Sequence, residues 1–205
     1  PAGYSGPATF YDYLVTLQKQ GEHGAGFTYK TVNTEVLGWI VKRVAGARLA
    51  DLTSQLIWSK LGCEHDALYQ VDSVGTESGG GGLATTLRDL ARFGEAMRCD
   101  GAFNGQQIVP AAVVADIRRG ADPAHFASAG YTTLPGWSYR NMWWVAHDAH
   151  QCFTARGIHG QLIWVDPTAE MVIARYASHP MAANVFLDPT SLPAYRALAE
   201  HLIRD

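Results

Sequence analysis

The sequence is poor in charged residues and has no long apolar run. Charged residues make up 17% of the chain, below the roughly 25% of an average domain, while hydrophobic residues make up 47%. This balance argues against a disordered chain, because enough apolar side chains are present to form a core. The formal net charge of −3 gives no reason to expect nucleic acid or an anionic membrane as a partner. No apolar run approaches the ~20 residues of a membrane-spanning helix, so we expect no membrane span.

Cysteine is scarce as well. Cys63, Cys99 and Cys152 are an odd number and include no Cys-x-x-Cys pair, which favours thiols over a disulfide framework. The opening residues, PAGYSGPATF, lack the basic and apolar regions of a signal peptide, and Pro1 is not an initiator residue. We therefore expect further residues upstream of Pro1. Both a cytoplasmic and a periplasmic location stay open.

Helical periodicity dominates the first part of the sequence, and strand-like composition follows. The order of helices, then strands, then one closing helix predicts the α+β class rather than alternating βαβ units. We expect a mainly helical subdomain over residues 1–135 and an antiparallel sheet with a C-terminal helix over residues 136–205. The helical patterns cover residues 9–20, 34–46, 49–62, 86–97, 110–119 and 191–204, and the strand patterns cover residues 142–146, 158–165 and 171–177, with a turn at residues 166–168.

Polar side chains gather just before an apolar helix, at Tyr29, Lys30 and Asn33. In the structural interpretation, Asn33 caps the helix predicted from Thr34, Tyr29 packs against neighbours and Lys30 is solvated. In the functional interpretation, Tyr29 is a general base, which requires a nearby cation such as Lys30 to stabilise its phenolate form. The local sequence leaves both interpretations open.

Two further segments have compositions typical of ligand sites. The run Gly79–Gly82 could hold a phosphate, but no Gly-Lys-Ser/Thr follows it, so a tight turn or a close backbone approach is favoured. His147, His150 and Cys152 are residue types that bind zinc. The spacing of the two histidines suits a helix, whereas their surroundings indicate a strand end and a loop. A zinc or Cys–His hydrolase is therefore the weaker alternative.

Small residues surround a histidine in the segment Arg156-Gly157-Ile158-His159-Gly160. A strand that begins with two glycines lets a substrate carbonyl approach the backbone, where an N–H group can stabilise an oxyanion. The structural alternative is a bulge at the edge of a sheet.

Taken in order, several segments resemble the serine β-lactamase and penicillin-binding-protein superfamily, in particular its nylon-oligomer amidases. They are Tyr29 before a helix, GGGLATTLRDLARFGEAM, the pair Trp143-Trp144, and GIHGQLIWVDP. The resemblance implies a β-lactamase/transpeptidase-like fold, of which this chain would be the C-terminal part. It also implies hydrolysis of amide or ester bonds through an acyl-enzyme, without a metal or cofactor.

The resemblance also implies residue roles. Tyr29 would relay protons as a catalytic residue, and the backbone N–H of Ile158 would donate a hydrogen bond to the oxyanion. The family's Lys-Thr-Gly is absent, so Arg156 or His159 would bind a substrate carboxylate in its place. The residues expected to contact the substrate are Asn33, Trp144, Arg156, Gly157 and His159.

The superfamily's nucleophile is missing from the chain, since no serine is followed by a lysine three residues later. The resemblance places this Ser-x-x-Lys well before Tyr29. We therefore expect it in a segment upstream of Pro1, which would act as a partner in completing the site. The expected substrate is a small amide or ester. The alternative is a non-catalytic binding protein that keeps the fold and lacks Ser-x-x-Lys upstream.

Overall fold

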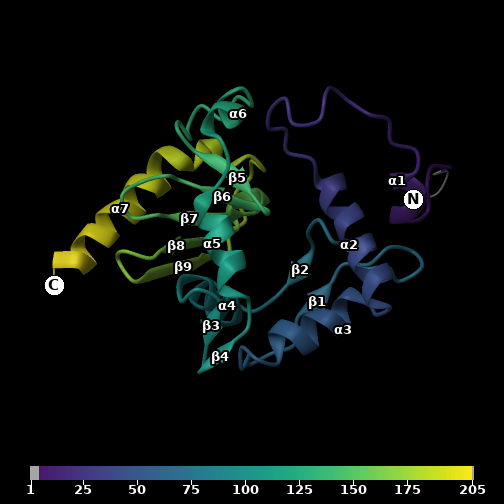
Figure 1. The fold of residues 1–205 in the computed structure, drawn as a ribbon, viewed down its shortest axis with the longest axis horizontal. Coiled ribbons are helices and arrows are strands. Elements are labelled where there is room, and N and C mark those ends of the chain that lie inside the picture. Colours follow the sequence, from purple (N-terminus) through teal and green to yellow (C-terminus); the bar gives the residue numbers. More distant parts are fainter. Residues whose placement is uncertain (1–4, 205) are drawn as a thin grey trace. The chain divides into compact units, whose positions relative to one another are not determined.

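The computed structural model describes residues 5–204, which form two compact units (Figure 1). The first unit contains the described residues up to His23 together with Tyr29–Thr86. The second contains Gly24–Thr28 and the described residues from Leu87 onward. Within the described range, no helix combines the length and apolar character needed to cross a membrane.

The first unit is mainly helical. Its two short strands form an antiparallel pair in which Leu68 lies opposite Ala84. The elements of this unit are α1 (Phe10–Leu14), α2 (Thr31–Ala45), α3 (Leu49–Thr53), a π-helical turn (Ser54–Trp58), β1 (Leu68–Tyr69) and β2 (Leu83–Ala84).

The sequence determines where α2 ends but not what covers it. Gly46 adopts the left-handed conformation (φ 63°) and its N–H donates to the Lys42 carbonyl, which confirms the predicted C-terminus. The helix starts at Thr31, three residues before the predicted Thr34. Its apolar stripe stays 36–84% exposed, because periodicity predicts a helix without naming its packing partner. The stripe consists of Val36, Leu37, Ile40, Val41 and Val44.

A five-stranded antiparallel sheet forms the centre of the second unit, with the strand order β5-β6-β7-β8-β9. Each strand pairs with its neighbour in the sequence, so the sheet is a meander. The predicted turn after Asp166 is confirmed, since Asp166 pairs with Met171 at the start of β9. The strands are β5 (Ser138–Arg140), β6 (Trp143–Val145), β7 (Phe153–Arg156), β8 (Leu162–Asp166) and β9 (Met171–Arg175).

Helices cover both faces of this sheet (Figure 1). On one face, Met97 and Val114 pack with Phe153 of the sheet. On the other, Trp164 of the sheet packs against Tyr195, with ring centroids 5.4 Å apart. The remaining elements of the unit are α4 (Leu87–Arg98), the hairpin of β3 (Ala102–Phe103) and β4 (Gln106–Gln107), α5 (Ala111–Arg119), α6 (Pro123–Ala127), two 3-10 turns (Ile158–Gly160 and Asn184–Phe186) and α7 (Asp188–Arg204).

The predicted α+β class is confirmed, while several boundaries are wrong. The helix predicted over residues 9–20 is limited to α1, and the strand predicted over residues 158–165 begins only at Leu162. Residues 158–160 form a 3-10 turn instead, with His159 at a φ of 58° that a strand does not allow. The strands β5 and β7 and helix α6 have three to five residues each, too few for a periodic pattern. The domain division at residue 135 stays a prediction.

Candidate active site

Tyr29 lies two residues before the first residue of α2, and its side chain is 45% exposed. Lys30 occupies the N-cap position, and its ammonium donates to the Gln20 amide oxygen at 2.6 Å. Asn33 is not the cap, since its own N–H donates to the Lys30 carbonyl within the first turn at 3.1 Å. The capping interpretation of Asn33 is therefore wrong. Its predicted contact with substrate stays a prediction, and its exposed position one turn beyond Tyr29 permits it.

The glycine run is held against the beginning of α2 by Glu35. The Glu35 carboxylate accepts hydrogen bonds from the Ser78 hydroxyl at 2.6 Å and from the N–H groups of Gly79 and Gly80 at 2.8 and 3.0 Å. A Cβ on Gly80 would lie 2.6 Å from the methyl group of Thr31, so a larger residue does not fit. Because a carboxylate occupies two of its N–H groups, this run is a close backbone contact rather than a phosphate cradle.

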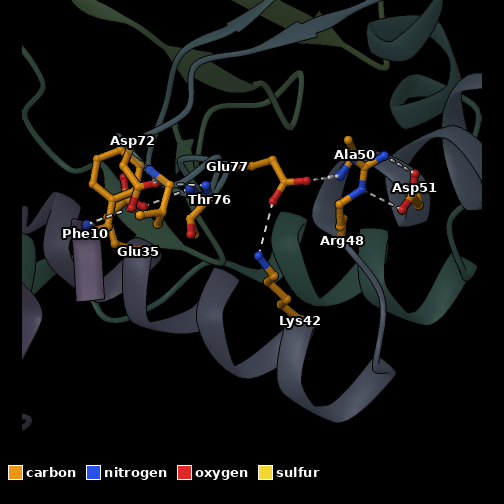
Figure 2. A network of polar contacts seen from close by, with 11 residues as sticks. Phe10, Glu35, Lys42, Arg48, Ala50, Asp51, Asp72, Thr76 and Glu77 are labelled. Atoms are coloured by element: carbon orange, nitrogen blue, oxygen red, sulfur yellow. Dashed lines mark hydrogen bonds and ion pairs between the residues drawn. The ribbon is translucent and has the colours of Figure 1, made fainter. Parts of the chain in front are cut away.

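Further polar contacts fasten the segment before the glycine run. Figure 2 shows Glu77 between the Lys42 ammonium at 3.7 Å and the Ala50 N–H at 3.3 Å. It also shows Asp72 accepting hydrogen bonds from the N–H groups of Phe10 at 3.0 Å and Thr76 at 2.8 Å. The loop is thereby tied to α1, α2 and α3. Sequence reasoning missed these carboxylates, since nothing in their local pattern names a partner.

We expect Glu35→Ala to lower the free energy of unfolding by about 1.5–3 kcal/mol, the value of hydrogen bonds to a charged group. The loss follows because two backbone N–H groups and one hydroxyl would lose their shared acceptor. Urea denaturation measures it. Glu35→Gln keeps one acceptor oxygen and should lose less, and Glu22→Ala, at an exposed ion pair with Lys19, is the control that should change little. An unchanged midpoint in Glu35→Ala would contradict the anchoring role.

Trp143 and Trp144 point to opposite faces of the sheet, as the alternation of strand side chains predicts. Trp143 packs against Phe153, with ring centroids 5.1 Å apart. Trp144 is only 6% exposed and lies in an aromatic cluster where the Tyr131 ring meets it edge-on at 4.9 Å. The role of Trp144 in a substrate pocket stays a prediction.

Arg156 is held by a buried carboxylate. Its guanidinium donates to Asp188 at 2.5 Å, and the two side chains are 6% and 7% exposed. Asp188 also accepts a hydrogen bond from the Thr133 hydroxyl at 2.6 Å, and the guanidinium lies over the Trp144 ring at 5.3 Å. Burial lowers the pKa of Arg156, and the neighbouring Asp188 opposes that effect. Arg156 therefore already has an internal counter-ion, while its predicted role in binding substrate stays a prediction.

The turn after β7 exposes one backbone donor. The N–H of Gly157 donates to the Gln161 carbonyl at 2.9 Å, and the N–H of His159 donates to the Ala182 carbonyl at 3.1 Å. Between them, the N–H of Ile158 has no acceptor among the described residues, and the Ile158 side chain is 66% exposed. The arrangement leaves this N–H available to an external oxygen. Tyr29 belongs to the first unit and Ile158 to the second, so their joint role in one active site stays a prediction.

The histidine and cysteine cluster differs from the one expected. His147 bonds the Ser138 hydroxyl through Nε2 at 2.7 Å, whereas His150 bonds the Asp166 carboxylate through Nδ1 at 2.8 Å. Burial raises the pKa of the Cys152 thiol, and the nearby carboxylates of Asp148 and Asp166 raise it further. A thiol that resists ionisation is a poor nucleophile, which argues against a Cys–His hydrolase. No disulfide joins the three cysteines, all of which the structure describes.

Comparison with known proteins identifies the family of this chain. The model of the Beta-lactamase family matches residues 1–188. The 6-aminohexanoate-dimer hydrolase of Paenarthrobacter ureafaciens is 37% identical over 175 residues, which cover 85% of this chain and 44% of that protein. A solved structure from Bacillus anthracis, assigned as a 6-aminohexanoate-dimer hydrolase, has a TM-score of 0.89 and 32% identity, and the match covers 100% of this chain and 51% of that one.

A more distant solved structure, a beta-lactamase from Mycobacterium bovis, shares the fold. Its TM-score is 0.69 at 19% identity, over 97% of this chain and 71% of that one. The chain spans about half the length of the two closer relatives, 44% and 51%. The family match over residues 1–188, the identity to a curated hydrolase and the shared fold lead to one conclusion: this chain belongs to the beta-lactamase family and has a β-lactamase/transpeptidase-like fold.

Proposed function

We propose that the whole protein hydrolyses amide or ester bonds through a serine acyl-enzyme, with a small linear amide such as the 6-aminohexanoate dimer as its substrate. The observation that carries this proposal is the 37% identity to a 6-aminohexanoate-dimer hydrolase over 85% of the chain. The proposal requires a nucleophilic serine and its lysine from a segment upstream of Pro1.

In the proposed reaction, the serine oxygen attacks the substrate carbonyl carbon and transfers its single proton to Tyr29, with the neighbouring lysine stabilising the phenolate that accepts it. That proton then passes to the leaving amine or alcohol as the carbonyl–heteroatom bond breaks, and water releases the acyl group. The 45% exposure of Tyr29 supports this role, because its hydroxyl must reach both the serine oxygen and the leaving amine or alcohol. The N–H of Ile158 would stabilise the oxyanion, and it is supported by the absence of an internal acceptor among the described residues.

The remaining candidates would bind and orient the substrate. His159 uses Nδ1 to contact the His179 carbonyl at 2.7 Å, which would direct its Nε2 toward a substrate carboxylate. Gly157 would leave room for the substrate backbone, and Asn33 would contact it from the first turn of α2. Trp144 and Arg156 pack on each other, so they would shape the pocket together.

The proposal is tested by comparing the 205-residue chain with a version extended upstream through the expected Ser-x-x-Lys. We expect only the extended protein to hydrolyse the 6-aminohexanoate dimer and a nitrophenyl ester, because the chain alone supplies no recognisable nucleophile. Replacing the serine of Ser-x-x-Lys by alanine should remove the activity. Burst kinetics from the 205-residue chain itself, abolished by changing one of its own residues, would contradict the proposal. An upstream sequence without Ser-x-x-Lys would favour the binding-protein alternative.

A further inference from the structure

Three side chains with metal-binding atoms meet at one end of the five-stranded sheet. The Nδ1 of His150, the Sγ of Cys152 and a carboxylate oxygen of Asp166 all lie within 4.8 Å of one another. Phe153 is paired with Val165, so Cys152 and Asp166 are the next residues of the same antiparallel register. The sheet itself therefore brings the thiol and the carboxylate together.

We propose that His150, Cys152 and Asp166 form a binding site for a divalent transition-metal ion, with Zn²⁺ as the best match. Imidazole nitrogen, thiolate sulfur and carboxylate oxygen are the three ligand types that Zn²⁺ takes in proteins. Metal–ligand bonds of about 2.0–2.3 Å at tetrahedral angles place ligand atoms roughly 3.5 Å apart. The observed separations, from 2.8 Å between His150 and Asp166 up to 4.8 Å, bracket this value.

Burial makes these ligands rigid while leaving a route for the ion. Cys152 and Asp166 are each 2% exposed, whereas the His150 side chain is 28% exposed and faces solvent on one side. The Cys152 carbonyl accepts a hydrogen bond from the N–H of Ala146 at 2.9 Å, which fixes the cysteine to the end of β6. The other Asp166 oxygen accepts the N–H of Ala169 at 2.9 Å, which orients the carboxylate.

Charge favours a cation at this point. A carboxylate and a sulfur that are both buried are costly to ionise together unless a positive charge lies between them. A bound ion would supply that charge, and the thiol proton would leave to solvent. His150 would bind the ion through the lone pair of Nδ1 and keep its ring proton on Nε2, so that the imidazole stays neutral. Asp148 stands beside the site, with its carboxylate accepting the N–H of Cys152 at 2.9 Å. A water molecule or Asp148 would complete four ligands.

None of these three residues is among the proposed catalytic residues. His147, which the sequence grouped with His150 and Cys152, bonds Ser138 instead, and Asp166 takes its place. The ion would fasten the loop between β6 and β7 to the end of β8. We infer a structural role, so binding can be measured without any substrate.

The test is titration of the chelator-treated protein with Co²⁺ and Zn²⁺. We expect one equivalent of Co²⁺ to give a thiolate-to-cobalt absorption band and the intense visible bands of tetrahedral geometry, and Zn²⁺ to displace it. Cys152→Ser should abolish the thiolate band and weaken Zn²⁺ binding about 100-fold or more, since losing even an outer-shell partner costs about 10–100-fold. Asp166→Asn should weaken binding in the same direction.

The matched control is Cys99→Ser, whose sulfur bonds Glu95 rather than a metal-binding cluster. It should bind Co²⁺ with an unchanged spectrum. Far-ultraviolet circular dichroism checks that every variant is folded, and Zn²⁺ should raise the melting temperature of the unaltered protein and of Cys99→Ser only. Absence of a thiolate band in the unaltered protein, or equal Zn²⁺ affinity in Cys152→Ser, would overturn the proposal.

Discussion

Replacing Tyr29 by phenylalanine in the complete protein should lower kcat/KM about 10²–10⁴-fold, the usual contribution of a positioned acid–base group. The substitution removes one oxygen and keeps the ring, so packing at the beginning of α2 is preserved. The melting temperature should move little, because a hydroxyl on a side chain that is 45% exposed contributes at most about 0.5–1.5 kcal/mol. The value of kcat/KM is measured with a nitrophenyl ester and with the 6-aminohexanoate dimer, and the melting temperature is measured by thermal denaturation.

A second tyrosine of the same unit provides the control for this measurement. Tyr13 lies in α1 and is 49% exposed, close to the 45% of Tyr29, so Tyr13→Phe removes a hydroxyl without a proposed role from a residue of similar exposure. Its rates should equal those of the unaltered protein. If Tyr29→Phe also kept full activity on both substrates, the proton relay would be wrong and Tyr29 would be a packing residue.

Replacing Asp188 by asparagine should lower the free energy of unfolding by about 3–5 kcal/mol, because it leaves the Arg156 guanidinium buried without its counter-ion. Both side chains are less than a tenth exposed, at 6% and 7%, so water cannot replace the lost charge. The change keeps the shape of the side chain, which separates the effect of charge from that of packing. For a chain of this size we expect the melting temperature to fall by roughly 6–20 °C.

The same helix contains the control for a surface ion pair. A guanidinium nitrogen of Arg204 lies 3.7 Å from a carboxylate oxygen of Glu200 in α7, and the Glu200 and Arg204 side chains are 62% and 78% exposed. Glu200→Gln should therefore change the unfolding free energy by about 0–1 kcal/mol. If Asp188→Asn and Glu200→Gln lowered the free energy of unfolding by similar amounts, the buried Arg156–Asp188 pair would stabilise the fold no more than a surface pair does. Arg156 would then be available to a substrate carboxylate.

Local sequence was sufficient wherever one residue or one short pattern decides the structure. Gly46 ends α2 because only a residue without a Cβ easily takes its left-handed conformation. The turn after Asp166 follows from proline and polar residues between two strand-like segments. The ordered set of segments around Tyr29 and Ile158 was enough to indicate the beta-lactamase family, which the comparisons confirm.

Local sequence failed where an element was too short for its pattern or where a conformation was decided by distant contacts. The segment at Ile158 has strand-like composition, yet it forms a turn at His159. The backbone N–H of His159 donates to the Ala182 carbonyl, and its Nδ1 contacts the His179 carbonyl, so distant residues stabilise the turn. Its glycines predicted an accessible backbone, and the use of that backbone by a substrate stays a prediction. They did not reveal that one N–H would remain without an internal acceptor.

By itself, then, the sequence determined the α+β class, the end of α2 at Gly46, the turn after Asp166 and the family, because propensity, turn chemistry and ordered segments are properties of neighbouring residues. Only the tertiary structure decided which charges are paired. Glu35 meets glycines 44 and 45 residues away, and Arg156 meets Asp188 32 residues away. Such pairs depend on which distant segments the fold brings into contact and on which polar groups are desolvated by burial. No periodicity encodes that information, so the buried carboxylates Asp166 and Asp188 became visible only in the folded chain.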